Sequence, residues 1–459
     1  MQKNRRSLFI FRRDLRIQDN TALRYAAGSS DELVCCFIFD PRQIGDHKYK
    51  SKFALEFMLN SLEELSAEID QKGGKLYFFH GEAEQVISNL ISNLKIEAVF
   101  HNKDYTPFSV KRDRAIESLC VEQSIRYESY DDALLTAPGA VLKDDGTPYT
   151  VYTPFYKRAS KLEVPEPQRA ASINYHTKKI ESSVSLDSLQ LKNPELDQIF
   201  LRGGRSEAKK ILNNLSKLEQ YKDERDFPAK GYTSGLSAHH KFGTVSIREV
   251  YHKAVEIFGQ EHQFIKELYW RDFFTHIGHH FPRVFKGNFN RKYDSVKWEN
   301  DQGKFWTWAK GETGFPIVDA GMRELNQTGY MHNRVRMIVA SFLTKDLHIN
   351  WRWGERYFAQ NLIDYDPAVN NGSWQWASST GCDAQPYFRI FNPWLQQKKF
   401  DSEAEYIRKW IPELKNASLA EIHDPERKQA LFGYPAPCLD HREAKSKTEA
   451  LFADALEAA

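Results

Sequence analysis

The stretch LVCCFIF, Leu33–Phe39, contains seven apolar residues without a polar interruption. A strand with one face in water alternates apolar and polar residues, whereas a strand covered on both faces does not. The run therefore predicts a strand buried on both faces. Such strands occur in parallel sheets that have helices packed on each side.

Residues on either side of this run repeat the pattern. Further strands are expected at Ser7–Phe11, Lys75–Phe79, Glu97–His101 and Arg126–Tyr130. Helical patterns separate them at Asn20–Ala27, Lys52–Lys72, Glu82–Leu94 and Ser109–Gln123. Residues 1–130 are therefore predicted to form an α/β domain with a five-stranded, parallel, doubly wound sheet. No GxGxxG motif follows the first strand and no P-loop is present, so the common nucleotide fingerprints are absent.

The rest of the chain changes character twice. Residues 131–205 are rich in turn-forming sequences such as Pro138-Gly139 and Pro165-Glu166-Pro167, and predict a connector between domains. Residues 206–459 have few β-branched runs and predict an all-helical domain. Its expected helices are Glu207–Tyr221, Ile247–Phe258, Phe264–His280, Ile317–Thr328, His332–Leu347 and Trp353–Leu362.

Composition excludes several classes of protein. The chain is 41% hydrophobic and 27% charged, which is typical of a globular protein and not of a disordered one. No apolar run approaches the roughly 18 residues of a membrane helix, so no membrane partner is expected. The five cysteines form no CxxC pair and no metal-ligand spacing, which favours reduced thiols in a cytoplasmic protein without a metal site.

Tryptophan and positive charge occur in the same part of the chain. All ten tryptophans lie between Trp270 and Trp410, and residues 206–400 carry a net charge of +6. Residues 1–205 sum to zero and residues 401–459 to −4. A solvated basic face would explain the charge alone. A basic surface interleaved with aromatic rings is also what unstacked nucleic acid bases require.

One predicted helix places a carboxylate, an indole and a guanidinium together. Glu267, Trp270 and Arg271 fall at i, i+3 and i+4 and therefore share one face. They are either a surface ion pair over a packed ring or the wall of a cavity that binds a base. Further along, Asn333 and Met337 are one turn apart.

Buried arginines need partners, and two acidic residues are available to Arg336. Asp364 and Asp366 follow it by some thirty residues, and either is a plausible partner. Asn370-Asn371-Gly372 then predicts a turn or a helix cap, followed by Trp374 and Trp376. Neutral amides beside indoles suit a flavin or a base, because ring edges need donors and acceptors without added charge.

A glycine-containing segment, Tyr232–Ser237 (YTSGLS), precedes one of the helical runs. Its hydroxyls and backbone N–H groups are consistent with a simple N-cap. They are equally suited to holding a diphosphate.

Taken together, these segments resemble the photolyase and cryptochrome flavoproteins, and look most like the class I cyclobutane pyrimidine dimer photolyases. The resemblance runs from Phe11–Arg16 (FRRDLR) through Thr313–Ala320 (TGFPIVDA) to Trp410. Its most specific motif is Asp364–Pro393. It implies an N-terminal α/β domain and a helical C-terminal domain that binds FAD.

The activity implied by the resemblance is that of a deoxyribodipyrimidine photolyase, a carbon–carbon lyase. Photoexcited FADH⁻ donates an electron to a pyrimidine dimer flipped out of damaged DNA, the cyclobutane ring splits, and the electron returns. The protein is expected to be a monomer.

Matching positions imply a role for each candidate residue. FAD-binding positions match Tyr221, Thr233, Ser234, Gly235, Leu236, Ser237, Arg336, Asp364, Asp366 and Asn370. Dimer-pocket and DNA-contacting positions match Arg225, Glu267, Trp270, Asn333, Arg334, Met337, Trp376 and Gln396, with Arg271 on the face of Glu267 and Trp270. Glu267 and Asn370 are the expected catalytic side chains. An electron relay from the surface to the flavin matches Trp374, Trp351 and Trp308.

The resemblance leaves alternatives within and beyond the family. A (6-4) photolyase would carry histidines at positions 333 and 337, where this chain has Asn333 and Met337. A signalling cryptochrome often has a long C-terminal tail, whereas about 50 residues follow Trp410. Nothing resembles the nicotinamide site of a dark flavin oxidoreductase. A second, antenna chromophore is also implied. A folate is favoured over a deazaflavin or a second flavin, although Phe108 and Ser109 replace the usual Asn-Glu pair.

Overall fold

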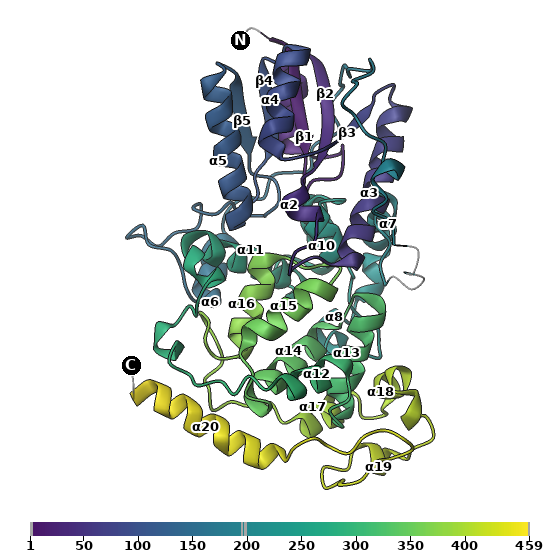
Figure 1. Ribbon diagram of the computed structural model, residues 1–459, viewed down its shortest axis with the longest axis vertical. Coiled ribbons are helices and arrows are strands. Elements are labelled where there is room, and N and C mark those ends of the chain that lie inside the picture. Colours follow the sequence, from purple (N-terminus) through teal and green to yellow (C-terminus); the bar gives the residue numbers. More distant parts are fainter. Residues whose placement is uncertain (1–2, 194–195, 197–199, 458–459) are drawn as a thin grey trace.

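The computed structural model describes residues 3–193, 196 and 200–457 of the chain (Figure 1). Its N-terminal part is a five-stranded sheet in the order β3-β2-β1-β4-β5, with every neighbouring pair parallel. The predicted α/β class is confirmed. The strands are β1 (Asn4–Phe11), β2 (Ser30–Phe39), β3 (Leu76–His80), β4 (Ala98–Asn102) and β5 (Arg126–Tyr130).

Helices cover both faces of this sheet, as continuous hydrophobicity in β2 predicts. On one face, Phe9 and Cys35 pack against α1 (Thr21–Ser29) and α3 (Lys52–Gln71). On the other, Leu8 and Val34 pack against α4 (Ala83–Leu94) and α5 (Pro107–Glu122). A short helix, α2 (Pro41–Ile44), follows β2. Alternate residues of each strand therefore face different cores, which leaves no wet face on the sheet.

The segment predicted as a connector is more structured than expected. It contains helix α6 (Tyr152–Ala159), and it returns to the sheet, where Tyr175 bridges to Leu33 and Val184 bridges to Phe78. Residues 194–195 and 197–199 of that segment lie outside the described residues. The division into residues 1–130, 131–205 and 206–459 stays a prediction.

The remaining helices form the lower part of the molecule in Figure 1. Their arrangement confirms the predicted helical C-terminal region. They are α7 (Arg205–Asn213), α8 (Tyr221–Glu224), α9 (Ser237–Phe242), α10 (Ile247–Phe258), α11 (Gln263–His280), α12 (Gln302–Lys310), α13 (Pro316–Thr328), α14 (Asn333–Ser341), α15 (Trp351–Asn361), α16 (Pro367–Ala377), α17 (Pro393–Phe400), α18 (Glu405–Trp410), α19 (Leu419–Ile422) and α20 (His441–Glu457). Within the described residues, no helix combines the length and apolar character needed to cross a lipid bilayer.

Three sequence predictions about helices are wrong in detail. The single helix expected at Glu207–Tyr221 is divided into α7, a 3₁₀ turn (Leu215–Leu218) and α8. The helix expected to run to Leu347 is α-helical only to Ser341 and continues as a π turn, η5 (Phe342–Asp346). The Asn370-Asn371-Gly372 segment is neither a turn nor a cap, because it lies inside α16.

Helix α16 begins three residues before Asn370. Asp366 is its N-cap, accepting hydrogen bonds from the backbone N–H groups of Ala368 and Val369, and Pro367 occupies the first turn. The helix packs against α11, α14 and α15. Because neighbours surround it on several sides, it has no polar stripe, and no amphipathic pattern announced it.

The sheet and the helical region meet along a tight seam. The backbone N–H of Leu15 donates to the carbonyl oxygen of Phe242 at 3.0 Å. Next to it, Gly243 has φ +64°, and an added Cβ would lie 2.1 Å from the carbonyl oxygen of Arg13. Only glycine fits both requirements, so the backbone after β1 is fixed against the end of α9.

Candidate functional site

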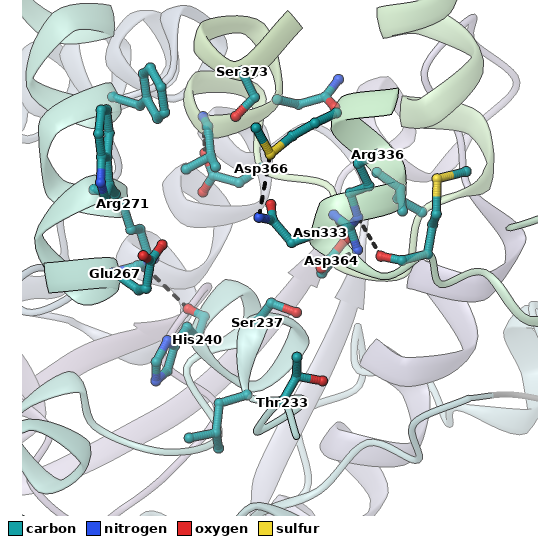
Figure 2. A pocket seen from close by; sticks show the side chains of 18 of the residues that line it. Thr233, Ser237, His240, Glu267, Arg271, Asn333, Arg336, Asp364, Asp366 and Ser373 are labelled. Atoms are coloured by element: carbon teal, nitrogen blue, oxygen red, sulfur yellow. Dashed lines mark hydrogen bonds and ion pairs between the residues drawn. The ribbon is translucent and has the colours of Figure 1, made fainter. Parts of the chain in front are cut away.

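A cavity of about 500 Å³ lies among the helices, lined by α8, the 233–237 loop, α9, α11, α14 and α16. Figure 2 shows Glu267 and Arg271 on one side and Asn333, Arg336 and Asp364 on the other. Its volume is in the range of pockets that bind organic ligands. Eighteen of the predicted site residues line it. Four do not: Trp308, Arg334, Trp351 and Gln396.

Glu267 lies in the wall of this cavity, and its ion-pair partner is Arg225 rather than the Arg271 of its own helix face. Its carboxylate accepts a hydrogen bond from Gln263 at 2.7 Å and forms an ion pair with Arg225. Burial lowers the pKa of Arg225, but the charge of Glu267 outweighs it and raises that pKa. Arg271 does not join the pair, because its guanidinium donates to the carbonyl oxygens of Ala133 and His240.

Trp270 offers one ring face to the cavity and has the other covered. Tyr152 of α6 stacks on it with ring centroids 3.7 Å apart and planes 6° apart. The Tyr152 hydroxyl donates to the carbonyl oxygen of Lys266 at 2.6 Å, which fixes the phenol. Sequence reasoning missed Tyr152 because it lies in a segment interpreted as connector.

Helix α14 supplies the opposite wall. The Asn333 amide points to the sulfur of Met337, one turn later, at 3.9 Å, as Figure 2 shows. Arg336 forms a two-pronged ion pair with Asp364 at 3.1 and 2.9 Å. That pair is one of the two partnerships considered from the sequence. Asp366, the other candidate, pairs with Arg13.

Asn370 is held by a residue that the sequence did not single out. Its amide nitrogen donates to the carbonyl oxygen and to a carboxyl oxygen of Glu355, at 3.1 and 3.0 Å. Burial raises the pKa of Glu355 to about 7. Asn370, which lines the cavity, is thus hydrogen-bonded to a carboxyl group that can bind a proton near neutral pH.

The predicted relay tryptophans are all buried. Trp374 lines the cavity, and its ring lies 6.2 Å from that of Trp308. Trp351 donates its indole N–H to Asn288 at 2.8 Å. Trp308, Trp351 and Trp374 have 0%, 2% and 2% of their surface exposed, so the relay as predicted lacks a member at the surface.

Two residues predicted to contact DNA lie outside the cavity. Arg334 forms an ion pair with Asp226 at 2.7 Å and lies over the ring of Phe400, 4.5 Å from its centre. Gln396 is half-buried on α17. Their roles stay predictions.

The residues of the cavity fit FAD. The 233–237 loop offers three hydroxyl side chains, and Gly235 has φ +69°, a conformation that suits glycine. Arg225, Lys241 and Arg271 also line the cavity and give it positive charge, which suits an anionic cofactor. The buried Nε2 atom of His240 has no partner among the described residues, which provides a polar atom for a ligand. The described residues contain no cluster of three or more metal-ligating side chains.

Comparison with known proteins agrees with this chemistry. The model of the FAD-binding domain of DNA photolyase matches residues 264–454, and the DNA photolyase model matches residues 7–171. The deoxyribodipyrimidine photo-lyase of Alkalihalophilus pseudofirmus is 38% identical, over 96% of each chain.

Solved structures give the same result. An archaeal photolyase from Sulfolobus tokodaii, crystallised with two FAD molecules, is 43% identical with a TM-score of 0.88, covering 98% of this chain and 100% of its own. A class III photolyase from Agrobacterium tumefaciens is 34% identical with a TM-score of 0.92, covering 100% and 98%. The chain belongs to the DNA photolyase family.

Proposed function

We propose that the protein repairs cyclobutane pyrimidine dimers in DNA when it is illuminated. The observation that carries this proposal is that residues suited to binding a lesion and residues suited to binding FAD line the same cavity. Glu267, Trp270 and Trp376 lie with Asn333 and Met337 in the same space as the residues that fit FAD. A dimer in this space would therefore lie within reach of the cofactor. A photolyase relative that is 38% identical over nearly the whole chain supports the activity.

The 233–237 loop, with Tyr221 and Leu236, would hold the diphosphate end of FAD. Backbone N–H groups and hydroxyls suit phosphate oxygens. The Arg336–Asp364 pair, Asp366 and Asn370 would surround the isoalloxazine ring. In the reduced state, FAD supplies a photoexcited electron that splits the cyclobutane ring and is returned afterwards.

The protein side chains bind and orient the lesion. Trp270, supported from behind by Tyr152, offers a flat surface for a flipped-out base, and Trp376 offers a second. Glu267 is the hydrogen-bonding group at the base edge, kept in place by Gln263 and Arg225. A carboxylate fixed before the lesion arrives needs no reorganisation when charge develops on the base.

The same residues argue against the (6-4) lesion as substrate. That alternative would place histidines at positions 333 and 337, and this cavity has an amide and a thioether there. A signalling cryptochrome would not need a complete lesion-binding wall. We therefore place dimer repair ahead of both alternatives.

A second chromophore is part of the proposal. The Sulfolobus tokodaii photolyase was solved with two FAD molecules, which favours a flavin over the folate expected from the sequence. The strand order reverses at β1 and β4, and ligands of open α/β sheets bind beyond the carboxyl ends of such strands. Phe108 lies there with the guanidinium groups of Arg42 and Arg112 5.5 and 5.8 Å from its ring centre.

One experiment tests the main proposal. Purified protein is expected to show flavin absorption bands and, once reduced, to restore DNA containing cyclobutane dimers under blue or near-UV light. Repair in darkness, or light-dependent repair confined to (6-4) lesions, contradicts it. Chromophores released by denaturation and separated by chromatography test the antenna, because a second flavin gives two flavins per chain.

A further inference from the structure

Asp366 is the point where the sheet region touches the cavity. One of its carboxylate oxygens caps α16, the helix that carries Asn370 and Trp374. The other oxygen is bound by the guanidinium of Arg13, which follows β1. Arg13, which does not line the cavity, therefore holds Asp366, which does.

Arg13 is itself fixed from three directions. Its guanidinium donates to Asp104 at 3.1 Å and to the carbonyl oxygen of Lys241 at 3.0 Å, besides Asp366. Its side chain is only 18% exposed, and the adjoining backbone is wedged against Gly243. The bond to Asp366 is thus made by a donor that has little freedom to turn away.

The charges around Asp366 leave a positive excess. Arg13, Lys241 and Arg271 act on it as cations, and Asp104 is the second anion of the group. Three cations thus act directly on the one carboxylate of Asp366. These neighbours hold the pKa of Asp366 well below its usual range even though burial raises it. Asp366 is therefore ionised at neutral pH.

We propose that Arg13 is a positioning residue through which the sheet region sets the redox balance of the flavin. Arg13 orients Asp366 at the polar edge of the ring and supplies the positive charge that keeps the surroundings of that edge cationic. Reduction of bound FAD to its anionic form consumes two electrons and one proton and adds a negative charge. A net positive environment stabilises that form over oxidised FAD. This inference rests on the proposed binding of FAD.

The test is the midpoint potential of the bound flavin, followed by absorption during titration with dithionite. Arg13→Gln removes the charge and keeps an amide donor, so the potential is expected to shift to a more negative value. Arg13→Lys keeps the charge, and its potential is expected to stay near that of the unchanged protein. Equal potentials in the Gln variant and the unchanged protein overturn the proposal.

Arg6→Gln is the matched control. Arg6 lies on β1, the strand that precedes Arg13, and pairs with Glu32 at the other end of the sheet from Asp366. The Arg6→Gln variant loses the same charge as Arg13→Gln, and no change in the flavin midpoint potential is expected. A shift as large as that of Arg13→Gln would point to net charge alone and contradict a specific role for Arg13.

A double-variant cycle tests whether Arg13 acts through Asp366. In an Asp366→Asn background, replacing Arg13 with Gln should shift the potential less than it does in the unchanged protein. Equal shifts in both backgrounds overturn the positioning role. If the unchanged protein binds no flavin, the proposed function fails instead, and its absorption spectrum reveals that before any variant is made.

Discussion

The ring centroids of Trp308 and Trp374 lie 6.2 Å apart, with their planes at 75°. From Trp308 the aromatic contacts continue to Tyr357 at 5.8 Å and then to Trp306 at 6.5 Å. Trp306 is 53% exposed. A continuous series of rings thus joins the cavity wall to solvent, and it does not pass through Trp351.

We expect Trp306→Phe to slow light-driven reduction of bound, oxidised FAD. The flavin would take an electron from Trp374, and Trp308 would return one to Trp374. An external thiol would then supply an electron at the exposed end of the series, Trp306. Absorption under blue light with dithiothreitol measures the rate. An unchanged rate in Trp306→Phe, together with a slowed rate in Trp351→Phe, would assign the route to Trp351 instead.

Trp308→Phe should slow the same reduction and also lower the free energy of unfolding. The Trp308 indole donates to the carbonyl oxygen of Val339 at 3.1 Å, and the substitution loses this bond at a net cost of about 0.5–1.5 kcal/mol, because the backbone N–H of Phe342 still donates to the same oxygen. Trp410→Phe is a suitable control, because its indole nitrogen has no partner among the described residues. The control should photoreduce at the normal rate.

Glu355 should make stability depend on pH. Its pKa is raised from 4.5 to about 7, so between these values the folded protein binds more protons than the unfolded chain. The free energy of unfolding therefore falls as pH rises from 4.5 to 7 and then levels off. Glu355→Gln removes this term, which is on the order of 3 kcal/mol.

Urea denaturation of both proteins at pH 4.5 and pH 8 measures the difference. The Gln variant is expected to gain relative stability only at the higher pH, while its side-chain oxygen still accepts the amide of Asn370. If the difference in unfolding free energy between the two proteins is the same at pH 4.5 and pH 8, the pKa of Glu355 is not raised by folding.

Replacing Tyr152 should weaken binding of the lesion, although Tyr152 does not line the cavity in which the lesion would lie. Tyr152→Leu removes the ring that backs Trp270, and such stacked pairs contribute about 0.5–1.5 kcal/mol beyond buried area. Affinity for dimer-containing DNA is expected to fall by up to about tenfold. Tyr152→Phe keeps the stack, loses only the bond to Lys266, and should bind normally; equal affinities in Leu and Phe variants refute the idea.

DNA binding should weaken with salt, and Arg334 should account for part of that dependence. If Arg334 exchanges Asp226 for a phosphate, Arg334→Gln lowers the slope of log affinity against log salt by about 1. Lys253 lies on α10, which contributes no residue to the cavity lining, so Lys253→Gln should leave the slope unchanged. Fluorescence anisotropy across a salt series measures all three proteins, and identical slopes count against Arg334.

Much of this fold follows from periodicity, and the exceptions have physical causes. The bounds of α10 match the sequence prediction, because the helix has a capping box at Ser246 and an apolar face, and the bounds predicted for β5 also match. Helix α16 was missed because burial on several sides erases its polar stripe. The π turn of η5 is invisible for a related reason: its five residues are all buried.

The site was predictable to the extent that its residues are local neighbours on a helix. Glu267 with Trp270, and Asn333 with Met337, share faces that a helical spacing fixes. Partners brought together by the tertiary fold were not accessible in the same way. Arg13 and Asp366 are 353 positions apart, and no local pattern distinguishes Arg13 from the other arginines near β1.

The return of the middle segment to the sheet, through Tyr175 and Val184, bears on how this chain can be recombined with its relatives. In a chimaera that exchanges residues 1–130 alone, Tyr175 and Val184 would have to bridge to strands taken from another protein. It would also separate Arg13 from the Asp366 it was matched to. Crossovers placed after the segment rather than before it keep the bridges together, so the unit of exchange is larger than the sheet.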